Sequence, residues 1–171
     1  EARARKTFDK RHERRAARDM ALFAGTYENK VDKKGRVSLP APFRAQLPEG
    51  DGRLVYVYRS PNLAALEACD QAFMERLAES LEQFDMFSDA EAEMGAVILA
   101  DARPLSLDGE GRIMIPAEYM EFANIDGQVA FAGHGRRFQL WEPSRLQAHT
   151  AESRTRVKGQ TFRLKPAESK S

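Results

Sequence analysis

The sequence has little of the chemistry that redox, metal or membrane proteins use. Its 171 residues include a single cysteine, Cys69, which excludes an intrachain disulfide and a cysteine-rich zinc site. The three histidines show no ligand spacing. No stretch approaches the roughly 18 consecutive apolar residues of a membrane span, and the N-terminus is too charged for a secretory signal. We therefore expect a cytoplasmic protein with no metal, no cofactor and no membrane partner.

Catalytic constellations are missing as well. No Ser/His/Asp or Cys/His set presents itself. The stretch GHGRR (133–137) is not a dinucleotide fingerprint, because it lacks the third glycine and the expected strand–helix order. We expect no enzymatic activity, no catalytic residues and no small-molecule substrate.

Charge is strongly segregated along the chain, although the formal net charge is only +1. Residues 1–19 carry +4, residues 20–63 carry +3 and residues 142–171 carry +4, whereas residues 64–101 carry −9. The field around each segment therefore matters more than the overall charge. Two interpretations of the acidic stretch stay open: a solvated face packed on the rest of the protein, or a contact surface for a neighbouring subunit.

One short stretch occurs twice. VDKKGRVSLPA (31–41) returns as LDGEGRIMIPA (107–117), and with one loop residue dropped the similarity extends over the units 27–67 and 103–142. In each unit a strand leads into an Asp-x-x-Gly turn and a second strand alternates apolar residues. Proline then ends that strand and opens a short helix, and a hairpin of two further strands completes the unit.

The repeat predicts the fold class. A unit of about 40 residues cannot bury enough surface to be stable alone, so we expect the two copies to form an internal pseudo-dimer. The pattern predicts an α+β, β-rich fold made of two tandem internal repeats plus peripheral helices. Between the repeats, the spacing of four apolar residues predicts an amphipathic helix within 68–87, followed by a second short helix: Phe73, Leu77, Leu81 and Phe84.

These patterns divide the chain into five segments. The basic first segment has no initiating methionine, and Met20 stands where a start would fit, so we expect this segment to be processed or foreign to the domain. The last segment is polar and contains proline, so we expect it to be flexible. The segments are the basic extension (1–19), the first repeat (20–68), the acidic connecting helices (69–101), the second repeat (102–150) and the tail (151–171).

The first turn is basic. Lys30, Lys33, Lys34 and Arg36 lie within seven residues at the tip of a predicted β-hairpin. A two-stranded ribbon fits the major groove of double-stranded DNA, where lysines neutralise phosphates and an arginine forks onto O6 and N7 of guanine. Asp32 is predicted to stabilise the turn, because an acidic residue beside DNA repels phosphate unless its charge is engaged locally. For Arg36 two roles stay open, as the partner of Asp32 or as a DNA contact.

Three stretches together resemble a known family. GTYENKVDKKGRVSLPAPFR (25–44), DGEGRIMIPAE (108–118) and FQLWEPSRL (138–146) are similar to the MraZ family of bacterial transcriptional regulators, within the AbrB-like swapped-hairpin group. The resemblance covers roughly residues 20–150. It implies a double swapped-hairpin barrel and a homo-oligomeric ring. It also implies a repressor that binds G-rich direct repeats of promoter DNA upstream of the division and cell-wall gene cluster, its own gene included, in the cytoplasm and on the nucleoid.

The resemblance can be carried over residue by residue. It places Lys34 and Arg36 on DNA-contacting positions of the first motif and Arg112 on the corresponding position of the second. The second turn has lost the lysines and gained Glu110, which puts its part in base reading in question. The residues expected to shape the turns themselves are Asp32 and Gly35 in the first copy and Asp108 and Gly111 in the second.

Two alternatives from other classes stay open. An antitoxin-like protein would use the same scaffold but would mainly hold a partner protein through residues 151–171, which offer only Val157, Phe162 and Leu164 as apolar anchors. A protein-interaction module would instead present the acidic helices to a basic partner.

Overall fold

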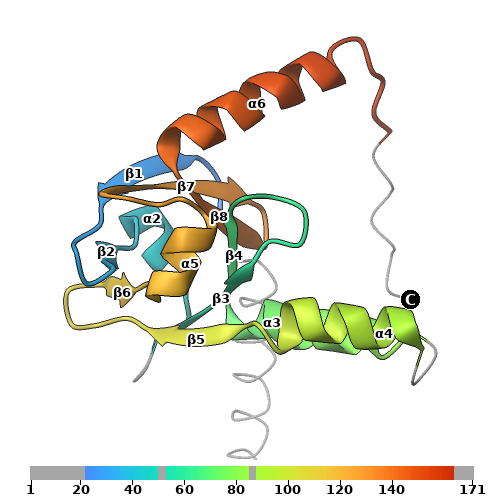
Figure 1. The fold of residues 1–171 in the computed structure, drawn as a ribbon, viewed down its shortest axis with the longest axis horizontal. Helices are drawn as coiled ribbons and strands as arrows, with labels where there is room; N and C mark the ends of the chain where they lie inside the picture. Colours follow the sequence, from blue (N-terminus) through green and yellow to red (C-terminus); the bar gives the residue numbers. More distant parts are fainter. Residues whose placement is uncertain (1–21, 50–52, 85–87, 164–171) are drawn as a thin grey trace, which may run out of the picture.

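The computed structural model describes residues 22–49, 53–84 and 88–163, and its strands form one large antiparallel sheet and a small ribbon (Figure 1). The predicted basic extension, 1–19, lies outside the described residues. The first repeat contributes β1 (Thr26–Lys30), β2 (Arg36–Ser38), α2 (Ala41–Arg44), β3 (Leu54–Arg59) and β4 (Leu66–Cys69). The connecting segment contributes α3 (Gln71–Leu81), α4 (Asp89–Met94) and η1 (Gly95–Leu99). The second repeat and the C-terminal segment contribute β5 (Arg103–Ser106), β6 (Arg112–Met114), α5 (Ala117–Phe122), β7 (Gln128–His134), β8 (Arg137–Trp141) and α6 (Pro143–Val157).

The two repeats exchange strands. The large sheet has the order β1-β7-β8-β4-β3-β5, with antiparallel pairing throughout. The first strand of the first repeat, β1, pairs with β7 of the second repeat, and β5 of the second repeat pairs with β3 of the first. The last strands of the repeats, β4 and β8, pair with each other. Each repeat therefore completes the sheet of the other, as a pseudo-dimer requires.

The strands of the described residues do not close into a barrel. β1 and β5 end the large sheet on opposite sides, while β2 and β6 form a separate two-stranded ribbon. An isolated bridge between Val31 and Val37 links β2 to the residue that follows β1. The predicted α+β, strand-rich class is confirmed. The closed barrel that the resemblance implies is replaced by an open sheet with a separate ribbon.

The main hydrophobic core, the largest of three clusters among the described residues, takes side chains from both repeats. Phe43 of α2 packs edge-on against Phe23 and Phe131, with ring centroids 5.4 Å and 6.5 Å away, and its ring lies 5.0 Å from Phe138. Full burial of such side chains stabilises the fold by about 1.5–3 kcal/mol each. The alternating residues of both second strands also belong to this core: Val37, Leu39, Ile113 and Ile115.

Each turn packs closely against the other repeat. Gly35 has a φ of +85°, and a Cβ built on it would lie 2.3 Å from the carbonyl oxygen of Ile115. Gly111 has a φ of +73°, and its Cβ would lie 2.6 Å from Cδ of Arg44 in α2. Met120, which holds the place of Arg44 in the second repeat, borders Gly35 in the same way, with Sδ 3.3 Å from the built Cβ. Each short helix therefore supports the turn of the opposite repeat.

The acidic connecting segment is helical. α3 begins at Asp70, whose carboxylate accepts the backbone N–H of Phe73 at 2.8 Å, and buries Met74 and Leu81. The predicted amphipathic helix is thus present within 68–87, and its start is set by the N-cap at Asp70. α4 begins at Ser88, which accepts a bond from the backbone N–H of Glu91, and continues directly into the π-helical turn η1.

The C-terminal segment forms a helix that was not predicted. The carboxylate of Glu142 accepts the backbone N–H groups of Ser144 and Arg145 at 3.2 Å and 3.0 Å, and Pro143 occupies the first turn. α6 continues to Val157, so the first part of the segment predicted to be a flexible tail is helical, and residues 164–171 lie outside the described residues. A polar composition says little about a helix that has a strong N-cap and a favourable first proline.

Alanine at Gly35 should destabilise the fold, whereas alanine at Gly109 should not. A positive φ costs a non-glycine residue about 1–3 kcal/mol, and the added Cβ at position 35 would also displace the Ile115 carbonyl. Gly109 is the matched control, because nothing lies within 4 Å of its built Cβ and its φ is not in the left-handed region. Urea unfolding measures both; equal losses of unfolding free energy would contradict the close approach of the repeats.

Candidate nucleic-acid interface

The first turn is organised by one carboxylate. Oδ1 of Asp32 accepts the backbone N–H groups of Lys34 at 2.9 Å and Arg36 at 3.0 Å, while Oδ2 accepts Nε of Arg36 at 2.6 Å. The backbone N–H of Gly35 donates to the carbonyl of Asp32 at 2.9 Å and closes the turn. Asp32 therefore holds the backbone of the tip and the guanidinium of Arg36 at the same time. Both carboxylate oxygens are needed, and asparagine offers only one acceptor oxygen.

The second turn repeats this geometry. Oδ1 of Asp108 accepts the backbone N–H groups of Glu110 and Arg112, each at 2.9 Å, and Oδ2 accepts Nε of Arg112 at 2.8 Å. The backbone N–H of Gly111 donates to the Asp108 carbonyl at 3.0 Å. The β2–β6 ribbon joins the two turns, which lie side by side at the left of the molecule in Figure 1.

Both aspartates are held in their ionised form. The pKa of Asp32 is lowered, chiefly because the backbone N–H of Arg36 donates to the carboxylate, and the Arg36 guanidinium acts in the same direction. The pKa of Asp108 is lowered by the backbone N–H of Arg112 and then by its guanidinium. Each carboxylate thus compensates the charge of its own arginine, and the positive charge left at the first tip is that of the lysines.

The two arginines differ in what their amino groups contact. Among the described residues, Nη1 and Nη2 of Arg36 have no hydrogen-bonding partner, and 41% of its side chain is exposed. Nη1 of Arg112 binds Oε2 of Glu110 at 3.0 Å, and its side chain is 32% exposed. Glu110 therefore occupies one arm of the guanidinium in the second turn, whereas the first turn presents its fork to solvent.

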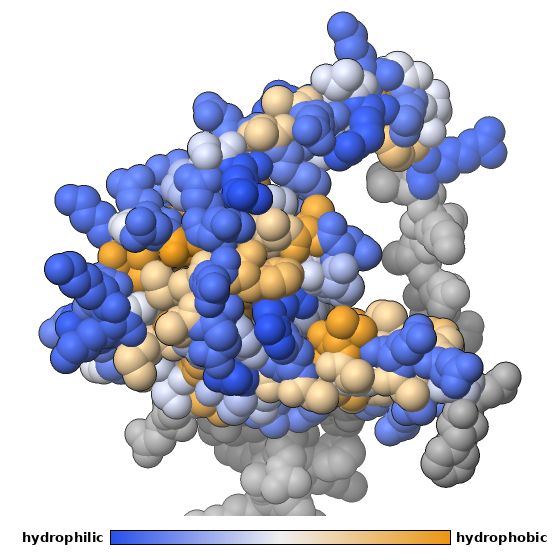
Figure 2. Space-filling model, in the orientation of Figure 1, coloured by the Kyte–Doolittle hydropathy of each residue, from blue (hydrophilic) through white to orange (hydrophobic). Residues whose placement is uncertain are grey.

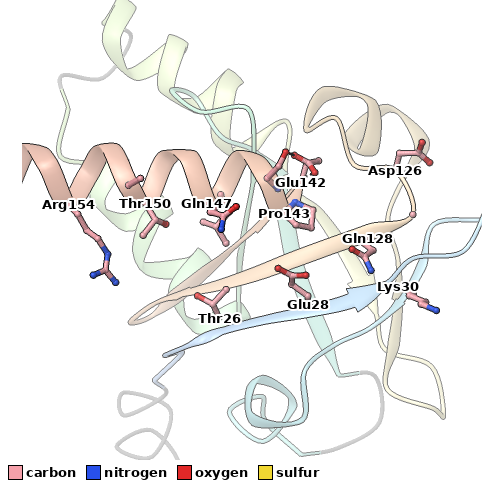
Figure 3. A pocket seen from close by; sticks show the side chains of 14 residues that line it. Thr26, Glu28, Lys30, Asp126, Gln128, Glu142, Pro143, Gln147, Thr150 and Arg154 are labelled. Atoms are coloured by element: carbon pink, nitrogen blue, oxygen red, sulfur yellow. Dashed lines mark hydrogen bonds between the residues drawn. The ribbon is translucent and has the colours of Figure 1, made fainter.

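The lysines are all exposed but occupy different places. Lys33 and Lys34 stand at the tip of the first turn, and Figure 2 shows a hydrophilic surface over this end of the molecule. Lys30 is the last residue of β1 and borders an open groove beneath α6 instead (Figure 3). No carboxylate in the described part of the chain forms an ion pair with any of the three lysines. The structure thus brings two of the three lysines together with Arg36.

One residue behind the turns was not identified from the sequence. Nη1 of Arg44 donates to the carbonyl of Leu39 at 2.6 Å, and the side chain of Arg44 closes over Gly111. Arg44 therefore positions the second turn from the first repeat. No spacing signal could have identified it, because the second repeat has Met120 at that position and the contact crosses between repeats.

The described residues offer no metal or membrane site. No three His, Cys, Asp or Glu side chains among them could hold a metal ion together. Cys69 is buried, and burial raises the pKa of its thiol to about 12. None of the helices in residues 22–49, 53–84 and 88–163 is long and apolar enough to cross a bilayer.

Comparison with known proteins gives consistent matches. The family model described as "MraZ protein, putative antitoxin-like" matches residues 22–60 and 98–164. The chain is 43% identical over 141 residues to the transcriptional regulator MraZ of Gluconacetobacter diazotrophicus, which covers 80% of this chain and 89% of that protein. It is 36% identical to the transcriptional regulators MraZ of Pelagibacter ubique (80% and 88% covered) and of Parvibaculum lavamentivorans (82% and 88% covered).

The lowered aspartate pKa values predict acid sensitivity of the turns. A carboxylate whose pKa is lower in the folded than in the unfolded state stabilises the fold above its unfolded pKa of about 4, and this contribution is lost as the pH falls through the folded value. Urea midpoints measured from about pH 7 to about pH 3 should therefore fall less steeply in Asp32→Asn/Asp108→Asn than in the parent chain. Asp126→Asn, at an exposed aspartate outside the turns, is the control and should follow the parent profile. Parallel profiles for all three chains would contradict the prediction.

Proposed function

The chain belongs to the MraZ family, and on that premise we propose that it is a transcriptional repressor that binds double-stranded DNA through its first turn. The relatives named above carry the name transcriptional regulator. The observation that carries the proposal for this chain is the exposed, forked end of Arg36 beside two unpaired lysines.

The turn has the chemistry that major-groove recognition needs. The Asp32 carboxylate holds Arg36 by Nε alone, which leaves the two amino groups free to form paired hydrogen bonds to O6 and N7 of a guanine. Lys33 and Lys34, exposed in the same turn, would neutralise phosphates. Because Asp32 fixes both the backbone and the arginine, little conformational freedom is left to lose on binding.

In this proposal the second turn mainly supports the structure of the first turn and contributes little to base recognition. Its Arg112 is held by both Asp108 and Glu110, and it has no lysines to attract phosphate. Its backbone, however, pairs with β2 through the ribbon and so supports the reading turn. We therefore assign guanine recognition to Arg36 and a supporting role, with at most a peripheral DNA contact, to Arg112. Lys30 would contribute at a distance, as a charge at the base of the hairpin.

A single turn would bind DNA weakly, so we also propose that several copies of the chain assemble. A homo-oligomer in which several first turns face direct G-rich repeats would raise the overall affinity without any new kind of contact, provided the repeat spacing matches the subunit spacing. We place the operator upstream of the protein's own gene, in the division and cell-wall gene cluster, and the protein on the nucleoid. The strand exchange described above is what a double swapped-hairpin scaffold of this kind would use.

Arg36→Ala should weaken binding to DNA from upstream of the protein's own gene far more than Arg112→Ala. A paired arginine–guanine contact is worth about 1–3 kcal/mol, or about 5- to 150-fold in affinity for each turn engaged. Fluorescence anisotropy at fixed salt measures the affinity, and sedimentation shows whether the assembly is unchanged. Arg145→Ala is the charge-matched control, since Arg145 is exposed at the start of α6. Equal affinities of Arg36→Ala and the Arg145 control would overturn the assignment.

A further inference from the structure

The β2–β6 ribbon has one buried face and one outward face. Val37 and Ile113 lie opposite each other and are buried in the main hydrophobic core. Because side chains alternate along a strand, the residues on either side of this pair point away from the core, and each of them is at least partly exposed. The outward face therefore consists of two cross-strand pairs: Arg36 with Met114, and Ser38 with Arg112.

Met114 lies directly beside Arg36 on this face. The backbone N–H of Ile115 donates to the carbonyl of Gly35 at 2.8 Å, which makes residues 35 and 115 a hydrogen-bonded pair of the antiparallel ribbon. The next pair, Arg36 and Met114, is then a non-hydrogen-bonded one, in which the side chains stand closer together. The Cβ atoms of such a pair are about 4.5–5.5 Å apart. The methionine side chain therefore leaves the ribbon next to the arginine that we assign to guanine.

The fold does not require an apolar side chain at position 114. Met114 is 60% exposed and belongs to none of the hydrophobic clusters of the described residues. Its counterpart in the first repeat is Ser38, which occupies the same place in the motif and is also exposed. Since the scaffold accepts a short polar residue at this place in one repeat, the methionine in the other is available for a contact outside the chain.

We propose that Met114 recognises the C5-methyl group of a thymine in the base pair next to the guanine assigned to Arg36. Thymine presents this methyl group in the major groove, where apolar side chains contact it. The methionine side chain is flexible and polarizable, so it can adapt to a methyl group one base-pair step of about 3.4 Å away. The inference rests on the proposed binding of DNA by the first turn. It adds a second base to the sequence recognised, contributed by strand β6 of the second repeat rather than by its turn.

The surroundings of Met114 favour DNA over an apolar protein surface. Lys33 and Lys34 are exposed in the adjoining turn, and Figure 2 shows a hydrophilic surface over this end of the molecule. An apolar protein partner would have to cover these charges without pairing them, which costs free energy. The major groove, by contrast, places thymine methyl groups between two rows of phosphates, so the methionine and the lysines can bind the same ligand.

Removing only the methyl group of thymine tests the inference. Two duplexes with the sequence upstream of the protein's own gene are compared by fluorescence anisotropy, one with thymine and one with uracil at every thymine position. The parent chain should bind the uracil duplex about fourfold more weakly for each turn engaged, which corresponds to one buried methyl group. Met114→Ser, which introduces the residue of the first repeat, should bind both duplexes equally, whereas Met114→Leu should keep the preference for thymine. Leu22→Ser is the matched control, because Leu22 is also 60% exposed but precedes β1, and it should discriminate as the parent chain does.

A third duplex separates this inference from the proposed function. Replacing guanine by 7-deazaguanine removes N7 and tests the Arg36 contact by itself. If the parent chain binds the 7-deazaguanine duplex more weakly but does not distinguish thymine from uracil, the role of Met114 is overturned and the proposed function stands. A parent chain that binds none of the duplexes overturns both.

The Met114 variants supply the remaining outcomes. A Met114→Ser chain that still prefers thymine to the same extent as the parent chain would overturn the inference. Sedimentation of the same chain shows whether its assembly has changed. Altered sedimentation together with an unchanged preference for thymine would mean that Met114 contacts protein instead of DNA.

Discussion

The structure depends on the backbone hydrogen bonds that join the two turns. The N–H of Leu39 donates to the Gly111 carbonyl at 3.0 Å, and the N–H of Ile115 donates to the Gly35 carbonyl at 2.8 Å. Both bonds cross between repeats, and they are symmetric, because each links the end of a second strand to the glycine of the opposite turn. A Cβ on Gly35 would push against this ladder. The repeated motif is therefore needed for folding, since a unit of about 40 residues on its own would leave its strands and its apolar face without partners.

That constraint explains how one turn could specialise while the other stayed structural. In both turns the aspartate accepts hydrogen bonds from two backbone N–H groups and from the arginine Nε. The turn geometry therefore requires no hydrogen bond from the arginine amino groups. In the second turn Glu110 binds one of them, whereas in the first turn both stay free. The proposed difference between a supporting turn and a reading turn thus rests on the neighbouring side chains, lysines in one copy and a glutamate in the other. The sequence left two roles open for Arg36, as the partner of Asp32 or as a DNA contact, and the geometry is compatible with both. Nε binds Asp32, and the two amino groups remain available to a ligand.

Much of the local structure could be predicted from the sequence because it is set by local chemistry. The Asp-x-x-Gly turns, the alternating apolar strands, the prolines before the short helices and the amphipathic α3 all follow from residues within one unit. What could not be predicted depends on contacts between units. The pairing of β1 with β7, the support of Gly111 by Arg44 and the open rather than closed sheet are set by packing between segments far apart in the chain, and patterns within one unit do not specify which segment of the other unit they meet. The helix α6 was not predicted for a different reason. Its N-cap at Glu142 is a local signal, but the polar composition of the residues that follow indicated a flexible segment.

The central claim is that the first turn reads guanine in the major groove, and methylation interference tests it most directly. DNA from upstream of the protein's own gene is methylated sparsely at guanine N7, bound by the full-length protein, and the bound and free fractions are sequenced. The account predicts that methylated guanines are depleted from the bound fraction at evenly spaced positions, one for each turn engaged, because N7 is one of the two atoms that the Arg36 fork contacts. Binding that tolerates N7 methylation at every guanine would contradict the account.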